Sequence, residues 1–301
     1  MVNDLNRLSD TFAKFLFARE ERKHLTLSLV NSVFEYAGET QLVDFDFLDR
    51  ELTPENEFSK LSRLDILGKC SDGTAVNVEI QVGRIDKMQN RSLFYWSKMY
   101  AQLKSGEDYN KLKRTVCINI LDHNYFDDEQ SQDFHNCFKA INVKNHNHLM
   151  TDVFEIHFIE MPKFERVDKY LKNSAGKLWK WLKYLSRKST EDERRGIAVQ
   201  DRDIAEAVST ENLFFTNPKL WWQYLGEEKD RRDAIALKNT FLREQKEAIE
   251  KMRAEGLIEG RAEGIEEGKI EMIKNLISMK MSIEDISKAS GWNKEKILEL
   301  M

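Results

Sequence analysis

The sequence predicts a mixed α/β domain followed by a mostly helical C-terminal region, and three observations support this class. Hydrophobic residues make up 41% of the 301 residues, which is enough apolar mass to bury a sizeable core. Residues 62–121 show the order strand, turn, strand, helix, strand, which is typical of mixed α/β domains. The chain has only 3 Pro and 13 Gly, and beyond Pro162 its apolar residues recur at helical spacing.

The predicted N-terminal domain begins with a helix over 10–37, for which Asp10 is a candidate N-cap. A hairpin follows, because Asp-Gly at 72–73 is a strong turn signal between two apolar segments. On the second hairpin strand, alternation places Val76, Val78, Ile80 and Val82 on one face and Asn77, Glu79 and Gln81 on the other. The predicted elements after the first helix are strands over 40–48, 62–70 and 74–82, a helix over 84–106 ending at Gly106, and strands over 114–121 and 152–160.

The rest of the chain is predicted to be helical. Helices are expected over 168–188, 201–209 and 217–226, and a long charged helix over 228–278 carries Glu-Gly at every fourth position from 255 to 268. Ser282, Gly291 and Asn293 predict the boundaries of short helices in the tail, whose apolar set is Ile283, Ile286, Trp292, Ile297 and Leu298. The predicted domains are a core over 1–165, a helical extension over 166–227, the long helix over 228–278 and a small helix-turn-helix-like tail over 279–301.

Composition excludes several classes of protein. No segment approaches the ~18 apolar residues of a membrane helix, and the N-terminus lacks the basic and apolar regions of a secretory signal. Three cysteines without a close pair argue against a disulfide framework and predict a cytoplasmic protein. The net charge is −5, yet residues 60–114 hold eleven Lys and Arg against six Asp and Glu. A local basic region is compatible with binding to nucleic acid, because phosphate contacts need a patch and not a global excess.

The most specific feature is a group of three polar side chains on the predicted hairpin. Asp65 lies on the first strand, while Glu79 and Gln81 share one face of the second. Pairing of the strands can bring the two carboxylates together, and adjacent carboxylates repel unless a divalent cation lies between them. Mg²⁺ prefers a few carboxylate oxygens plus waters and suits phosphoryl chemistry. The amide of Gln81 can orient a water or a phosphate oxygen but supplies no positive charge.

These residues resemble the PD-(D/E)XK nuclease superfamily and, more narrowly, the PD-(D/E)XK nuclease family transposases, also called recombination-promoting nucleases. The resemblance covers roughly residues 8–190. It rests on Arg63-Leu64-Asp65-Ile66-Leu67, Asp72-Gly73, Val78-Glu79-Ile80-Gln81, Arg91 with Tyr95 and Tyr100, Gly106 with Tyr109, Ile118-Asn119-Ile120-Leu121 and the segment from Ile156 to Phe164. It implies a restriction-endonuclease-like core, metal-dependent cleavage of DNA, and a link to recombination or mobile elements.

The resemblance also assigns roles to residues. It implies Asp65 and Glu79 as ligands of Mg²⁺ or another divalent cation, with Gln81 in the place usually held by a catalytic Lys. Leu64 replaces the Pro of the superfamily name. Because Gln81 has no charge, more of the charge stabilisation falls to the metal or to Arg91. An acid on the first helix often assists in the superfamily, and Asp10 and Glu20 are both candidates.

Several alternatives remain open. Arg91 and Tyr95 are one helical turn apart, so both could face the site, or Tyr95 could lie in the core with Arg91 in a salt bridge. Lysines and aromatic residues over 172–188 could follow a DNA backbone or could belong to a solvated and packed helix. The segment Asn145-His146-Asn147-His148 contains the letters of an HNH nuclease motif, and with His135 and Cys137 nearby it raises a zinc site as a further hypothesis. Paired-ligand spacing is absent, and a polar surface loop is the other interpretation.

Three functions are compatible with these patterns. The favoured function is a DNA endonuclease. A catalytically inactive nuclease fold that binds DNA or another protein is the second, and a self-associating scaffold built on the C-terminal helix is the third. The Glu-Gly repeat bears on the last, because four glycines cost a helix about 1 kcal/mol each and allow close approach of another helix. A flexible linker explains the repeat equally well.

Overall fold

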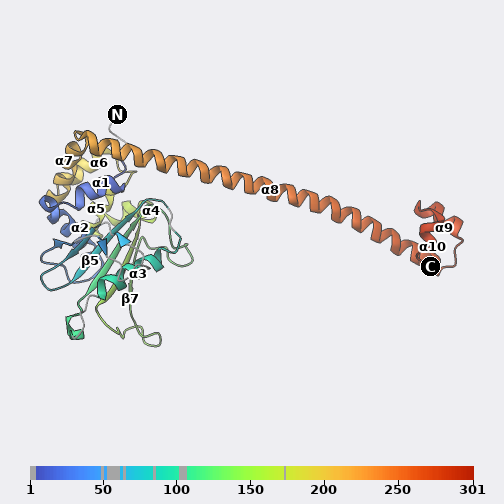
Figure 1. The fold of residues 1–301 in the computed structure, drawn as a ribbon, viewed down its shortest axis with the longest axis horizontal. Helices are drawn as coiled ribbons and strands as arrows, with labels where there is room; N and C mark the ends of the chain where they lie inside the picture. Colours follow the sequence, from blue (N-terminus) through green and yellow to red (C-terminus); the bar gives the residue numbers. More distant parts are fainter. Residues whose placement is uncertain are drawn as a thin grey trace. The chain divides into compact units, whose positions relative to one another are not determined.

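The computed structural model describes residues 5–48, 51–52, 62–63, 66–83, 86–101, 107–172 and 174–301. The chain divides into two compact units, residues 1–231 and residues 232–301. The first unit contains a mixed sheet with helices, and the second is helical (Figure 1). The predicted α/β class with a long helical C-terminal region is therefore confirmed. None of the helices in the described ranges combines the length and the apolar character needed to cross a bilayer.

The described strands of the first unit form a six-stranded sheet in the order β1-β4-β5-β6-β8-β7. Strands β5, β6 and β8 run parallel, whereas β4 pairs antiparallel with β5 and β7 pairs antiparallel with β8. The predicted turn is confirmed, because Gly73 has a φ of +93° and its N–H donates to Cys70 O at 2.9 Å. The strands are β1 (Asp46–Phe47), β4 (Ile66–Lys69), β5 (Ala75–Gln81), β6 (Thr115–Leu121), β7 (His135–Lys139) and β8 (Phe154–Glu160), and β2 (Glu51–Leu52) pairs separately with β3 (Ser62–Arg63).

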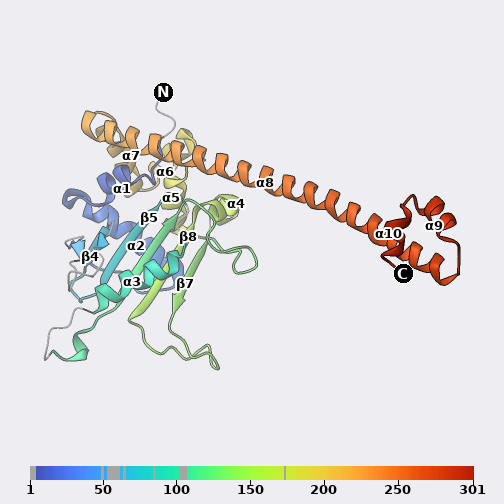
Figure 2. The same cartoon turned by 45° about the vertical axis from the view of Figure 1, so that its right-hand side comes forward.

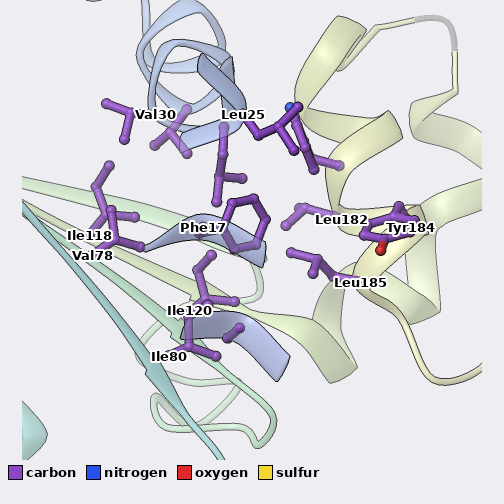
Figure 3. Close-up of a cluster of buried hydrophobic side chains, with 14 of the residues drawn as sticks. Phe17, Leu25, Val30, Val78, Ile80, Ile118, Ile120, Leu182, Tyr184 and Leu185 are labelled. Atoms are coloured by element: carbon purple, nitrogen blue, oxygen red, sulfur yellow. The ribbon is translucent and has the colours of Figure 1, made fainter. Parts of the chain in front are cut away.

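The sheet is covered on both faces (Figure 2). On one face, Val76, Val78 and Ile80 of β5 join the apolar cluster that includes side chains of α1, α2 and α5. Figure 3 shows part of this cluster, with Phe17, Leu182 and Leu185 packed toward the sheet. On the other face, Met88, Tyr95 and Met99 of α3 pack with residues of β6 and β8. The helices of the first unit are α1 (Asp10–Phe17), η1 (Glu20–Arg22), α2 (Lys23–Ala37), α3 (Met88–Tyr100), η2 (Tyr109–Lys111), α4 (Met161–Leu171), α5 (Gly176–Leu185), α6 (Glu191–Ala198) and α7 (Arg202–Phe215).

Several predicted helix boundaries are wrong. The helix predicted over 10–37 is broken after Phe17, because the side chains of Arg22 and Thr26 bond the carbonyls of Phe15 and Phe17 and so end α1. The N-cap is Ser9, whose hydroxyl accepts from Phe12 N, and Asp10 is the first helical residue. The helix predicted over 168–188 is two helices, α4 and α5, and α4 begins directly after β8.

Four further elements differ from the predictions. Strand β7 and helix α6 were not predicted from the sequence, and the strand predicted over 40–48 is reduced to β1. The predicted helices over 217–226 and 228–278 are one helix, α8 (Pro218–Ser278), which begins in the first unit and continues in the second. The predicted helix end at Gly106 lies outside the described residues.

The second unit contains most of α8 together with α9 (Ile283–Ser290) and α10 (Lys294–Leu298). Ser282 and Asn293 cap these two helices as predicted, and Gly291 ends α9 with a φ of +73°. Ile273, Ile286 and Ile297 form a small buried cluster, whereas Leu298 is exposed and does not belong to the apolar set.

Candidate active site

A buried carboxylate, that of Glu79, lies on β5 between β4 and β6 and beneath α3. The face that carries Asn77 and Glu79 is polar in sequence, yet both side chains are buried. Asn77 Nδ2 donates to Glu79 Oε1 at 3.3 Å, and Arg91 Nη2 of α3 donates to Glu79 Oε2 at 3.2 Å. Burial and the charge of Glu79 both raise the pKa of the neighbouring Cys117 thiol, so this thiol stays protonated. Each oxygen of the Glu79 carboxylate thus accepts a hydrogen bond, one from Asn77 and one from Arg91.

The structure shows the second interpretation of Arg91 and Tyr95. Tyr95 is buried in the cluster between α3 and the sheet, while Arg91 forms a salt bridge whose partner is Glu79 itself. The guanidinium carbon of Arg91 lies 5.1 Å from the centroid of the Tyr95 ring, which supports a cation–π contact. The Arg91 side chain keeps 32% of its surface exposed. A cation that is fixed by a buried acid and still accessible can contact an anionic ligand.

Two buried polar atoms of this cluster have no hydrogen-bond partner in the described part of the chain: Asn77 Oδ1 and Arg91 Nε. Buried polar groups are seldom left unpaired, so such atoms call for an explanation. One is an oxygen next to a carboxylate, and hard oxygen donors of this kind suit Mg²⁺. The other is a cationic N–H, which suits a phosphate oxygen. The donor set fits a divalent cation together with a phosphate group.

Gln81 lies at the end of β5, on the same face as Glu79. Its amide Nε2 donates to Val82 O at 3.1 Å, so the side chain folds back on the following backbone. No described contact joins Gln81 directly to Arg91. The structure therefore brings Glu79 and Arg91 together and leaves Gln81 at the edge of the group.

The remaining predicted site residues lie elsewhere or cannot be placed. Asp65 lies outside the described residues. Asp10 is half exposed, pairs with Lys14 at 2.5 Å, and belongs to α1 on the opposite face of the sheet from Glu79. Glu20 is exposed and pairs with Lys23 at 2.9 Å. The described contacts of these two acids thus give neither of them a place beside Glu79.

Sequence reasoning missed a pair of residues at the same edge of the sheet, Asp122 and His123. They follow β6 directly, and Asp122 N donates to Gln81 O at 3.1 Å. The signal was available, because an acid and a histidine right after an apolar strand are positioned by that strand. Asp122 Oδ1 accepts from Gly83 N at 2.8 Å and lies 3.1 Å from His123 Nδ1.

The basic segment over 172–188 packs into the structure instead of forming an aromatic DNA platform. Trp181 and Tyr184 are fully buried, so their rings cannot stack on bases. The lysines of α5 pair with acids of neighbouring helices, for example Lys183 with Asp168 at 2.7 Å and Lys180 with Asp201 at 3.2 Å. The solvated and packed interpretation of this helix is favoured.

The histidine and cysteine raised for zinc also have structural partners. Cys137, Glu155 and His157 come close enough to share an ion, and His135 Nε2 lies 2.9 Å from His157 Nδ1. However, Arg114 already forms a bidentate pair with Glu155, in which Nε lies 3.2 Å from Oε2 and Nη2 lies 3.0 Å from Oε1. Both oxygens of Glu155 are thus taken, because His157 Nε2 also lies 2.5 Å from Glu155 Oε1, and the group is better explained as a buried ion-pair network.

The fold and the site together define an α/β domain in which the buried Glu79 on a central strand pairs with the guanidinium of Arg91. The acid–histidine pair Asp122 and His123 lies where the strands end. The sequence profile described as PD-(D/E)XK nuclease family transposase matches residues 7–241. The chain therefore belongs to the PD-(D/E)XK nuclease family transposases, which confirms the resemblance noted in its sequence. No curated protein and no solved structure matches the chain.

Proposed function

We propose that the protein is a DNA endonuclease that uses Mg²⁺ or another divalent cation to hydrolyse phosphodiester bonds. The observation that carries this proposal is the cluster of Asn77, Glu79 and Arg91. In it the buried carboxylate pairs with the guanidinium, and Asn77 Oδ1 and Arg91 Nε have no hydrogen-bond partner in the described part of the chain. Family membership makes DNA cleavage plausible. The proposed link to recombination or mobile elements rests on the family alone.

Each residue has a distinct role in this proposal. Glu79, together with Asp65, would hold the cation, and the unpaired Asn77 Oδ1 is a further oxygen beside it. When bound, the cation supplies Lewis-acid activation and neutralises charge that develops on the phosphate. Arg91 supplies the positive charge that Gln81 lacks, through its free Nε and its exposed edge. Gln81 orients the attacking water through its amide once it turns away from Val82 O.

The test is cleavage of supercoiled plasmid with Mg²⁺, Mn²⁺, Ca²⁺ or EDTA. The full chain is compared with Asp65→Asn and Glu79→Gln, and Glu129→Gln serves as a matched control because Glu129 is an exposed acid. We expect cleavage by the parent and the control only, and its loss in EDTA. Cleavage that survives both site substitutions would contradict the proposal.

The alternative is an inactive nuclease fold that binds DNA or another protein. It predicts no cleavage with any cation, but a DNA affinity that falls steeply with salt, because binding to phosphates releases counterions. Fluorescence anisotropy with a labelled duplex at two salt concentrations separates this case from a scaffold, which shows no such affinity. The predicted cytoplasmic location remains a prediction.

We further propose that α8 pairs with a second copy of the chain. Ile235, Leu242 and Ile249 are spaced by seven residues, and all three side chains are about half exposed or more. The glycines from 256 to 268 have open space where a Cβ would stand, so a partner helix can approach. Sedimentation of the full chain beside Leu242→Glu with Ile249→Glu tests this, and equal masses would exclude pairing.

A further inference from the structure

The pair Asp122 and His123 has the geometry of an oriented base. Asp122 Oδ1 is fixed by the backbone N–H of Gly83 at 2.8 Å and lies 3.1 Å from His123 Nδ1. A carboxylate only accepts hydrogen bonds at neutral pH, so Nδ1 must carry the ring proton and donate it to Asp122. The other ring nitrogen, Nε2, is then an unprotonated acceptor.

The Nε2 atom of His123 is buried and has no hydrogen-bond partner in the described part of the chain. The side chain as a whole is 15% exposed. A histidine that only filled space would be expected to bond through both nitrogens, because an unpaired buried acceptor is costly. An orienting acid on one nitrogen and a free lone pair on the other is the arrangement that general bases use.

The pair also lies close to the candidate site. Asp122 N donates to Gln81 O at 3.1 Å, which places the pair at the end of β5, two residues beyond Glu79 along that strand. The ring centroid of His123 lies 6.4 Å from that of Tyr125. The Tyr125 hydroxyl donates to Gln89 Oε1 on α3 at 2.6 Å, so the aromatic neighbour of His123 is tied to the helix that carries Arg91. Tyr125 is held in turn by its N–H, which donates to Glu160.

We propose that His123 is a proton-transfer residue for phosphodiester hydrolysis and that Asp122 positions it. The inference rests on the proposed nuclease function. The water oxygen forms a bond to phosphorus, and Nε2 takes the proton that this water releases. The opposite P–O ester bond breaks with its electron pair on the leaving oxygen, which takes a proton from solvent, and the imidazolium returns its own proton to solvent. Asp122 keeps its own charge and stabilises the imidazolium.

The direction of the pH dependence follows from the role of Nε2 as a base, and the charged and titratable groups near the ring are Asp122, Tyr125 and Arg231. Asp122 faces Nδ1, and Tyr125 packs against the ring. The hydrogen bond to Glu228 raises the pKa of Arg231 on α8, and the charge of Asp122 contributes to this rise. Nε2 must be unprotonated to accept a proton, so the rate falls on the acid side of the profile. Removing the imidazole should abolish that fall.

The experiment is single-turnover plasmid cleavage across a range of pH, with DNA affinity measured separately in Ca²⁺. The variants are His123→Gln and Asp122→Asn, and His146→Gln is the control because His146 lies on an exposed loop. We expect His123→Gln to lower the rate by ~10²–10⁴-fold and to lose the acid-side fall, with unchanged DNA affinity. Asp122→Asn should lower the rate less, because the ring keeps its base but loses its orientation.

The outcomes separate this inference from the proposed function. Cleavage by the parent with an unchanged rate and pH profile in His123→Gln overturns the inference alone. A loss of DNA affinity that accounts for the whole loss of rate also overturns it, in favour of a binding role. If His123→Gln unfolds, as judged by its melting temperature, the pH profile of Asp122→Asn decides. A well-folded parent that never cleaves overturns both.

Discussion

Helices α3 and α5 cover opposite faces of the same sheet, and both carry cations among aromatic rings. On α5 the lysines pair with acids of the neighbouring helices, and Trp181 and Tyr184 are buried. On α3 one cation is Arg91, and its partner is the buried Glu79 on a central strand. The charges of α5 are thus neutralised by surrounding helices, whereas α3 holds a charge pair with unpaired polar atoms beside it. A basic, aromatic pattern therefore identifies function only when its partners are known.

The largest expected difference concerns the acids of the two regions. Glu79→Gln should reduce cleavage by at least about 100-fold, because Glu79 is a direct ligand of the cation in the proposed function and even supporting residues of metal sites are worth 10–100-fold. Asp201 caps α7 and pairs with Lys177 and Lys180, so Asp201→Ala should leave cleavage unchanged. It should instead cost about 1–3 kcal/mol of unfolding free energy. Plasmid cleavage and urea unfolding of both variants check this. Full cleavage by Glu79→Gln, or lost cleavage by a folded Asp201→Ala, would contradict the comparison.

A third charged group, around His135 and Glu155, extends the comparison to acid pH. Burial and the neighbouring His157 lower the pKa of His135 to about 3. Burial alone would raise the pKa of Glu155, but His157 and Arg114 hold it below its usual range. As pH falls below about 6.5, the unfolded chain binds a proton that folded His135 does not, so stability decreases. The Glu155 contribution is lost at still lower pH.

Urea unfolding at pH 7 and pH 4.5 measures this effect. The parent should lose stability between the two values, and His135→Gln should lose less, because the group that titrates only in the unfolded chain is gone. Identical losses in both proteins would show that His135 is not responsible. Structural ion pairs such as these should leave the metal dependence of cleavage unchanged.

The smallest expected effect is in salt dependence. Lys87 is exposed one turn before Arg91, whereas Lys180 of α5 is already paired with Asp201. Lys87→Gln should lower the slope of log affinity against log salt by about 0.9, as for one lost phosphate contact. Lys180→Gln should leave the slope unchanged. Fluorescence anisotropy with a labelled duplex measures both, and equal slopes would mean that DNA does not follow α3.

The sequence was sufficient to predict the α/β class, the hairpin and the strands β5, β6 and β8. Alternation along β5 correctly placed Val78 and Glu79 on opposite faces, because strand periodicity is local. Strand β7 was not predicted, since its polar residues form a strand only through pairing with β8. The break between α1 and α2 was also missed, because it depends on side chains that bond the end of α1.

For the site, the sequence named Glu79 and offered Arg91 as a candidate. It did not reveal that each would be the partner of the other, because that requires α3 to lie across β5. His123 was missed because its orientation comes from Asp122 and the backbone of Gly83, which lies 40 positions earlier. The roles of the α5 lysines were left open for the same reason, since their acidic partners lie on other helices.

The central claim is that Arg91 supplies the charge that Gln81 lacks, and one series of variants tests it directly. Single-turnover plasmid cleavage is measured for the parent, for Arg91→Met, and for Arg91→Met combined with Gln81→Lys. Losing the cation should reduce the rate by about 10²–10³-fold, and a lysine at position 81 should restore a large part of it. A rate for Arg91→Met equal to that of the parent would contradict the account.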